Sequence, residues 1–272
     1  MITPHDVRHL ESVEVAGLAD LYRMMPPAYA AAERMGARRF GTALGIRAAR
    51  ADVLALNRIV GLGLVEPATA GDLDAALQWF HEAGVPRAFV QVAPHAEPDM
   101  LAAWLQARGL TYYNNWVRLW RDTTPLPPQP TTLRVEQVGA DLADLFGRIV
   151  AEAFHMPIDA GGWVTSTFGQ PGWRHYMAFD GDAPAATAAL FVQGSTGWLG
   201  AAATRADARG KGAQSALIAR RIADAHAQGC TRLSVETAEP TETREAPSYR
   251  NVRRLGFEVA YKRANWLWVR KG

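Results

Sequence analysis

The chain has 272 residues, of which 49% are hydrophobic and 21% are charged, and its formal net charge is +2. This length suggests one or two domains of about 100–200 residues each, and the composition is that of a globular protein with enough apolar material for a core in each half. The nearly even charge excludes a general polyanion binder, so we expect no nucleic-acid partner. The single cysteine, Cys230, excludes an internal disulfide and fits a reducing compartment.

The beginning of the chain, MITPHDVRHLESVEV, carries acidic residues early and has no apolar core of signal-peptide length. No stretch reaches the roughly 18 uninterrupted apolar residues that a membrane-spanning helix needs. We therefore expect a cytoplasmic protein without a membrane partner.

Two parts of the first half have counterparts later in the chain. HEAGVPRAFVQV (81–92) aligns without gaps with HAQGCTRLSVET (226–237), and ARGLTYYNNWVRLW (107–120) resembles RLGFEVAYKRANWLWVR (254–270). The first pair indicates a helix end, a capping glycine and a strand, and the second a helix end, a glycine turn and two strand-like runs. Any αβ unit can produce such matches by chance, but their common order and spacing favour a duplication.

The segment TTPLPPQP (123–130) has four prolines in eight residues. Such a segment cannot sustain a helix or a central strand and indicates an extended spacer. We therefore predict one domain over residues 1–122, a linker over 123–130 and a second domain over 131–272.

The second half contains alternating strand and helix patterns. In chain order these predict a strand over 132–138, a helix over 141–154, a short helix over 162–168, a hairpin over 173–192 that turns at 180–182, a strand over 195–204, a helix over 212–228, a strand over 231–237, a helix over 247–256 and a final pair of strands.

A glycine-rich, basic turn, ARGKGAQSAL, separates the third strand of this half from its long helix. Such a turn leaves backbone N–H groups and the positive end of the helix dipole free for an anion. Gly210 and Gly212 remove side chains that would keep an anion from the backbone, and Arg209 and Lys211 add charge. The turn therefore predicts a phosphate site. The Walker pattern fails because Gly212 follows Lys211, and Ser215 replaces the third glycine of a dinucleotide motif.

The run from Arg209 to Gln214, RGKGAQ, is similar to the R-x-x-G-x-G/A signature of the GNAT superfamily of acyl-CoA-dependent N-acyltransferases. The order of predicted elements over residues 131–270 resembles that fold, and PSYRNVRRLGF (247–257) resembles its later helix and Gly-Phe end. The resemblance implies an α/β (α+β) protein with two GNAT-like domains. Each would have a mixed, mostly antiparallel sheet flanked by helices, and the first would be a degenerate copy.

The same resemblance implies acetyl-CoA (coenzyme A) as the cofactor. The implied contacts lie on the third strand of the second half, on the basic turn and on the following helix: Ala202, Ala203, Thr204, Arg209, Gly210, Lys211, Gly212, Ala213, Gln214 and Asn251. Two positions depart from the family pattern. Gln214 stands where the signature has glycine or alanine, and Val252 stands where a tyrosine usually protonates the leaving thiolate.

The corresponding stretch of the first half, GLGLVEPATAGDL (61–73), lacks the signature, and Glu66 would repel an anion there. We therefore expect the first half not to hold coenzyme A.

Three residues are candidates for proton transfer. Glu236, at the end of a predicted strand, could accept the proton of an amine or hold a cationic substrate, or it could simply face solvent. Tyr249 lies one helical turn before Val252 and could replace the missing tyrosine, or it could pack; Ser248 is the next candidate. His155 and Trp163 are candidates for substrate binding, against the alternative of an exposed loop. The histidines have no metal-ligand spacing, so we expect no metal.

These features predict a cytoplasmic N-acyltransferase that moves an acetyl group from acetyl-CoA to a primary amine, by direct attack in a ternary complex. The expected acceptor is a small molecule, because no extended charged groove is predicted. Two alternatives remain at this point: a non-catalytic sensor that binds acyl-CoA, and an interaction protein without a cofactor. The sequence leaves open the acceptor, the acyl chain length and whether a homodimer forms.

Overall fold

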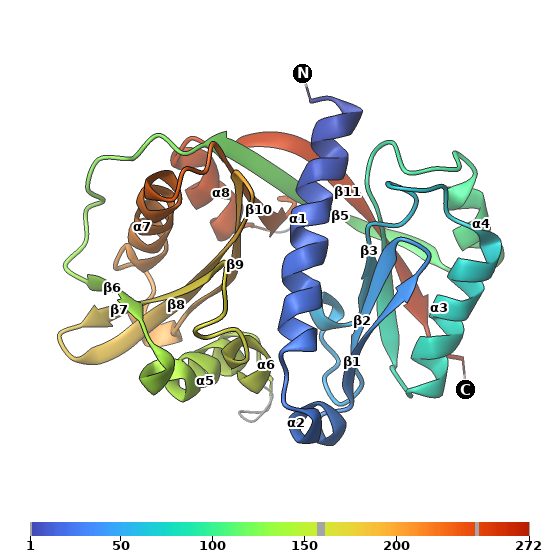
Figure 1. The fold of residues 1–272 in the computed structure, drawn as a ribbon, viewed down its shortest axis with the longest axis horizontal. Helices are drawn as coiled ribbons and strands as arrows, with labels where there is room; N and C mark the ends of the chain where they lie inside the picture. Colours follow the sequence, from blue (N-terminus) through green and yellow to red (C-terminus); the bar gives the residue numbers. More distant parts are fainter. Residues whose placement is uncertain (1, 157–160, 243–244, 272) are drawn as a thin grey trace. The chain divides into compact units, whose positions relative to one another are not determined.

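The computed structural model describes residues 2–156, 161–242 and 245–271. The chain forms two compact units (Figure 1): unit 1 comprises Met1–Arg118 and Ala260–Gly272, and unit 2 comprises Leu119–Val259. The spacer at 123–130 contains no helix or strand. The predicted domain boundaries and the duplication stay predictions, because compact units and sequence repeats need not coincide. Among the described residues, no helix combines the length and apolarity needed to cross a membrane.

Unit 1 contains a mixed sheet whose strand order is β1-β2-β3-β4-β11-β5. Adjacent strands are antiparallel in the pairs β1/β2, β2/β3 and β4/β11, whereas β3 and β4 are parallel and are connected through α3. The elements are α1 (Pro4–Arg23), α2 (Pro27–Ala32), β1 (Met35–Phe40), β2 (Ala43–Ala48), the 3-10 helix Leu54–Leu56, β3 (Arg58–Val60), α3 (Ala70–Glu82), β4 (Arg87–Val92), α4 (Leu101–Ala107), the first part of β5 (Thr111–Asp122) and most of β11 (Glu258–Val269).

Unit 2 contains a sheet in the order β10-β9-β8-β7-β6, antiparallel except for the parallel pair β9/β10. Helix α7 lies on one face of this sheet, and α5 and α6 lie on the other (Figure 1). The elements are β6 (Arg134–Val138), the 3-10 helix Ala140–Leu142, α5 (Ala143–Ala153), α6 (Gly162–Thr165), β7 (Trp173–Asp180), β8 (Ala183–Gln193), β9 (Thr196–Thr204), the 3-10 helix Ala206–Ala208, α7 (Ala213–Ala227), β10 (Arg232–Ala238) and α8 (Pro247–Arg254).

This architecture confirms the predicted fold class, a mixed and mostly antiparallel sheet flanked by helices. The predicted order of strands and helices in the second half is also confirmed, including the hairpin turn, where Gly181 has φ 60°. The final pair of strands is wrong: each tryptophan-rich run is one strand, β5 in the first half and β11 at the end. The physical reason for β11 is that no glycine or proline interrupts residues 257–271.

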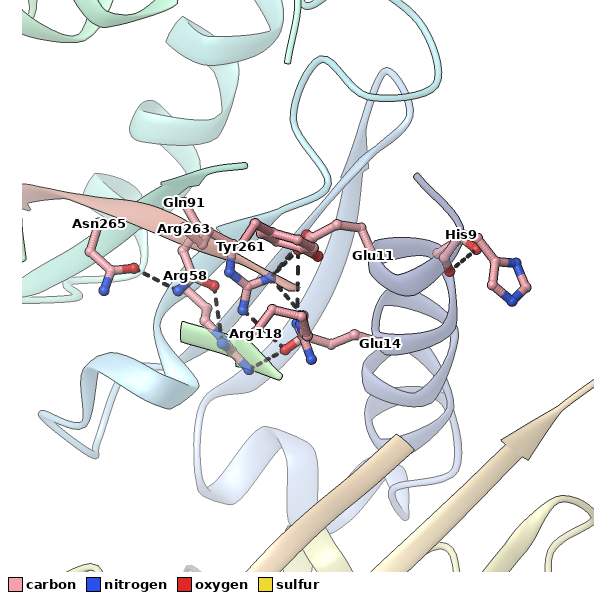
Figure 2. Close-up of polar contacts among 10 residues, drawn as sticks. His9, Glu11, Glu14, Arg58, Gln91, Arg118, Tyr261, Arg263 and Asn265 are labelled. Atoms are coloured by element: carbon pink, nitrogen blue, oxygen red, sulfur yellow. Dashed lines mark hydrogen bonds and ion pairs between the residues drawn. The ribbon is translucent and has the colours of Figure 1, made fainter. Parts of the chain in front are cut away.

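Unit 1 buries a network of charged side chains, which we call the buried charge network. It consists of Glu11 and Glu14 from α1 and of Arg58, Arg118 and Arg263 from three strands (Figure 2). All five residues are 5% exposed or less. The Nη1 of Arg263 lies 2.6 Å from Oε2 of Glu14, and Arg118 donates to the same oxygen. A buried carboxylate is stable only with such partners.

Neutral polar side chains extend this network. The hydroxyl of Tyr261 donates to Glu11 at 2.6 Å, and Arg58 donates to Oε1 of Gln91 at 3.0 Å. Burial by itself would raise the pKa of Glu14, but the three arginines together hold the pKa of this carboxyl well below its usual range. Helix α1 is therefore fixed to its sheet by ion pairs as well as by apolar packing.

Replacing Glu14 with glutamine should destabilise unit 1 strongly, because three buried arginines would then share one carboxylate. We expect the free energy of unfolding to fall by about 3–5 kcal/mol, measured by urea denaturation. The exposed residue Glu66 provides a control, since Glu66→Gln should change it by less than about 0.5 kcal/mol. Equal stabilities of the two variants would contradict a stabilising role of the network.

Candidate functional site

Strands β9 and β10 separate in unit 2 before either strand ends. Their parallel pairing covers only residues 196–199 of β9 and 232–235 of β10, whereas β9 continues to residue 204 and β10 to residue 238. Beyond this point the peptide groups of β9 on that edge have no partner in β10. An edge of this kind is open to a ligand that can pair with backbone.

A β-bulge lies next to the opening. The register between β8 and β9 shifts between the pairs Thr187–Ala203 and Ala189–Gly200, so β9 holds one extra residue there. Ala201, within this bulge, has φ 45°, a left-handed conformation that costs a residue with a side chain of order 1–3 kcal/mol. The bulge redirects the backbone of β9 where the strands separate.

The first turn of α7 has free backbone donors. Helix α7 starts after Gly212. The N–H of Ala216 donates to the carbonyl oxygen of Gly212 at 3.1 Å, and this is the first backbone hydrogen bond at the start of the helix. Within the described part of the chain, no group accepts a hydrogen bond from the N–H groups of residues 210–215. These donors and the helix dipole form a site for an anion.

The two glycines of the turn serve different purposes. Both are left-handed, with φ 82° at Gly210 and 83° at Gly212. A Cβ at Gly210 would meet nothing within 4 Å, so this position leaves space in front of the turn. A Cβ at Gly212 would lie 2.8 Å from the carbonyl oxygen of Pro130. The second glycine is therefore required by backbone conformation and by packing against the end of the spacer.

A pocket of about 640 Å³ connects the open edge of β9 to the start of α7. Its lining residues come from α5, β8, β9, the glycine turn, α7 and α8: Ala153, Phe154, Thr187, Ala202, Ala203, Thr204, Ala208, Arg209, Gly210, Gly212, Ala213, Gln214, Ser215, Leu217, Arg221, Pro247, Ser248, Asn251 and Arg254.

The charged residues that line this pocket are all basic: Arg209, Arg221 and Arg254. Arg221 is 2% exposed, and it donates from Nε to the oxygen of Leu217 at 3.1 Å and from Nη1 to the oxygen of Ala189 at 3.0 Å. Burial lowers its pKa to about 10, so it remains a cation at neutral pH. Among the described residues, its partners are these two carbonyl oxygens and Tyr176, and no carboxylate pairs with it. The pocket therefore favours a polyanion.

Residues 147–257 match the model of the "Acetyltransferase (GNAT) family", and every residue that lines the pocket lies within this range. The chain carries a GNAT acetyltransferase domain. The match over these residues confirms the resemblance drawn from the glycine turn. None of the curated protein sequences is significantly similar to the chain.

Solved structures share the fold at low sequence identity. A GCN5-related N-acetyltransferase from Kribbella flavida is 18% identical, with a TM-score of 0.65 and a match that covers 98% of this chain and 96% of that chain. A GCN5-related N-acetyltransferase from Sphaerobacter thermophilus is 16% identical, with a TM-score of 0.60 over 85% of this chain and 81% of that chain. A tandem GNAT protein from the clavulanic acid biosynthesis pathway is 16% identical, with a TM-score of 0.50 over 74% and 70%.

Most of the residues predicted to bind the cofactor line the pocket of the GNAT domain. The exception is Lys211, whose Nζ lies 2.7 Å from Oδ2 of Asp180. This hydrogen bond raises the pKa of Lys211 and directs its side chain to the hairpin between β7 and β8. The other nine predicted cofactor residues are among those that line the pocket: Ala202, Ala203, Thr204, Arg209, Gly210, Gly212, Ala213, Gln214 and Asn251.

The catalytic candidates are not gathered in this pocket. Ser248 lines it from the first turn of α8, whereas Tyr249 is half-buried on the same helix and is not part of the lining. Glu236 lies on β10 directly after the last residue paired with β9, also outside the lining. Val252, the position that the resemblance assigns to the family's tyrosine, is 1% exposed.

The two predicted substrate residues also lie outside the pocket lining. His155 is exposed just after α5, in a left-handed conformation with φ 54°. Trp163, on α6, is half-buried and packs against the core around Phe146. Among the residues that the structure describes, no group of three or more His, Cys, Asp or Glu side chains could hold a metal ion.

Sequence reasoning missed several residues of the pocket. Leu217 and Arg221 follow Ala213 at successive intervals of four, and this helical spacing could have placed them on the face of α7 that meets the pocket. Thr187 is fully buried, and none of the described groups forms a hydrogen bond with its hydroxyl. Its position depends on the register between β8 and β9, for which the sequence gives no signal. For Arg254, the sequence indicates only a position on the helix over 247–256.

The corresponding turn of unit 1 is closed. The side chain of Thr69 accepts a hydrogen bond from the N–H of Asp72 at 3.0 Å and so caps α3, and Asp72 adds a negative charge to its first turn. A Cβ at Gly63 would lie 2.2 Å from the carbonyl oxygen of Glu97, so the backbone of that segment occupies the space before the helix. This turn lacks the open space found before α7, and the helix that follows it has a side-chain cap and an acidic first turn.

Alanine substitutions should separate the roles of the two glycines. Gly210→Ala meets open space and should cost only about 1 kcal/mol of stability, from the left-handed backbone. Gly212→Ala adds a clash with the backbone of Pro130 and should cost clearly more. Thermal or urea denaturation of both variants measures the difference. A Gly212→Ala variant as stable as Gly210→Ala would contradict the packing role.

Proposed function

We propose that the protein is an acetyl-CoA-dependent N-acyltransferase that acts on the primary amine of a small molecule. The observation that carries the proposal is the uncapped start of α7, which opens into a basic pocket beside the unpaired edge of β9. The match to the acetyltransferase model over the same residues supports it.

The chain offers suitable groups for the diphosphate and for the pantetheine arm of coenzyme A. The N–H groups of residues 210–215 would bind the diphosphate, with the side chains of Arg209, Arg221 and Arg254 adding positive charge. The open edge of β9 from Ala202 to Thr204 would pair with the amides of the pantetheine arm. The empty space at Gly210 and the absence of acidic side chains among the lining residues fit a polyanionic ligand.

Acetyl-CoA supplies the acyl group as an activated thioester. The protein has to align an amine with the acyl carbon, to stabilise the oxyanion that develops and to transfer protons. The bulge around Ala201 redirects backbone N–H groups at the opening and is the proposed source of the oxyanion donor. Glu236 is the proposed base for the amine, and Tyr249 or Ser248 is the proposed proton donor to the leaving sulfur. His155 and Trp163 remain proposed contacts of the acceptor.

The acceptor and the cellular location are proposed from features of this chain and not from the family match. A small-molecule amine is proposed as the acceptor for two reasons. The net charge of the chain is only +2, and the residues that line the pocket include no acidic side chain that would form a groove for a basic macromolecule. A reducing compartment such as the cytoplasm is proposed because the one cysteine is buried and unbridged. The first half is proposed to be a degenerate copy that does not bind the cofactor, as the capped start of α3 supports.

A second candidate function is an acyl-CoA sensor without turnover. The buried side chain of Val252 at the position of the usual tyrosine favours this alternative. A sensor would bind acetyl-CoA but release no free thiol with any amine of a broad panel. An acyltransferase would release the thiol with at least one of them.

Calorimetric titration with acetyl-CoA should give one site per chain. Gly210→Asp places a carboxylate in the open space beside the free N–H groups and should weaken binding at least about tenfold. Gly210→Asn is the matched neutral control, because asparagine also tolerates the left-handed backbone, and it should bind more tightly than the aspartate variant. Two sites per chain, or equal affinities of the two variants, would contradict the proposed binding site.

Tyr249→Phe should lower turnover about a hundredfold if the hydroxyl is the proton donor, while the affinity for acetyl-CoA stays unchanged. The exposed Tyr112 in unit 1 provides the control, since Tyr112→Phe should not affect turnover. Steady-state thiol release and calorimetry measure the two quantities. Unchanged turnover of Tyr249→Phe would remove this residue from the mechanism and leave Ser248 as the candidate.

A further inference from the structure

The side chain of Gln214, at the last position of the glycine-rich signature, takes part in a chain of hydrogen bonds. Nδ2 of Asn251 donates to Oε1 of Gln214 at 2.7 Å, and Nη2 of Arg254 donates to Oδ1 of Asn251 at 3.3 Å. The same Nη2 also donates to Oγ of Ser215 at 2.9 Å, which holds the guanidinium in place. All four side chains belong to residues that line the pocket.

The donors and acceptors of these side chains determine which amide atom of Asn251 and of Gln214 faces each neighbour. A guanidinium has only donors, so the group of Asn251 that faces Arg254 has to be its oxygen. The amide nitrogen of Asn251 then faces Gln214, and Gln214 has to present its own oxygen to it. As a consequence, Nε2 of Gln214 is left with both of its N–H donors, and none of the described groups accepts from them.

This orientation leaves a side-chain donor on a residue that lines the same pocket as the free backbone donors. Gln214 is the second residue of α7, within the turn whose N–H groups lack acceptors. With a glycine or alanine at this position, the backbone N–H groups would be the only donors of the turn. A glutamine with its oxygen turned toward the pocket would repel an anion. Arg254 and Asn251 therefore determine whether Gln214 attracts or repels a phosphate group.

Resting on the proposed function, we propose that Gln214 binds the diphosphate of the acyl-CoA through Nε2, and that Asn251 and Arg254 are positioning residues that set the direction of its amide. A hydrogen bond from a neutral donor to a charged acceptor is stronger than a neutral pair, so its loss is measurable in affinity. In this account Gln214 is a further binding group that the signature does not contain.

Two substitutions test the two parts of the proposal. Gln214→Met keeps the length of the side chain but removes both polar groups, and it should weaken binding about tenfold or more. Asn251→Asp leaves Gln214 intact, but the aspartate carboxylate can only accept hydrogen bonds. Nε2 of Gln214 then has to donate a hydrogen bond to this carboxylate, and Oε1 of Gln214 turns toward the pocket. This variant should therefore weaken binding by at least as much. Gln106→Glu, which adds the same charge at an exposed position of unit 1, should have no effect.

Calorimetry with three probes identifies the group that is bound. Coenzyme A has a diphosphate and a 3′-phosphate, dephospho-coenzyme A has only the diphosphate, and pantetheine has neither. We expect both substitutions to lower the affinity for coenzyme A and for dephospho-coenzyme A by the same factor, and to leave the affinity for pantetheine unchanged. Far-UV circular dichroism and thermal denaturation verify that each variant is folded. If a variant fails this check, Gln214→Ala replaces Gln214→Met and Asn251→Ala replaces Asn251→Asp.

Each contrary result overturns a defined part of the proposal. Wild-type affinity of Gln214→Met overturns the binding role of Gln214. If Gln214→Met loses affinity for coenzyme A and Asn251→Asp does not, the positioning role of Asn251 is overturned. A loss with coenzyme A but not with dephospho-coenzyme A overturns the assignment to the diphosphate. A wild-type protein that binds neither of the two nucleotides contradicts the proposed function and, with it, this inference.

Discussion

The structure of the GNAT domain depends on backbone polar groups that the protein itself does not satisfy. Strands β9 and β10 pair over four positions and then separate, and the N–H groups before and within the first turn of α7 have no described acceptor. Peptide groups without partners are unfavourable when they are shielded from water. Here they border one basic pocket, so a ligand with amides and phosphate groups can replace the missing partners. The proposed binding of acyl-CoA follows from this arrangement.

The two units show how the same succession of elements can be open or closed. In both, a parallel pair of strands is connected through a helix, α3 in unit 1 and α7 in unit 2. A threonine cap and an acidic first turn close α3, whereas a left-handed glycine without a side chain precedes α7. In unit 1 the interior instead contains the buried charge network, whose ion pairs fix α1 to its sheet. Stability and binding are thus served by different polar groups.

Much of this could be predicted from the sequence, because short-range signals determine it. The glycine turn, the start of α7, the hairpin at Gly181 and the order of strands in the second half all follow from residues close together in the chain. The direction of Lys211 toward Asp180, the burial of Arg221 and the hydrogen-bond chain from Arg254 to Gln214 depend on contacts between distant segments. The parallel pairing that ends at residue 199 depends on register, which the sequence does not encode locally.

The central claim is that the free N–H groups at the start of α7 bind the phosphates of coenzyme A. The most direct measurement is the chemical shift of individual backbone amides in ¹⁵N-labelled protein, recorded by NMR as coenzyme A is added. The account predicts large, saturable shifts for Ala213, Gln214 and Ser215, and none for the capped start of α3 around Asp72. Unchanged amides in the first turn of α7 at saturating coenzyme A, or shifts confined to α3, would contradict it.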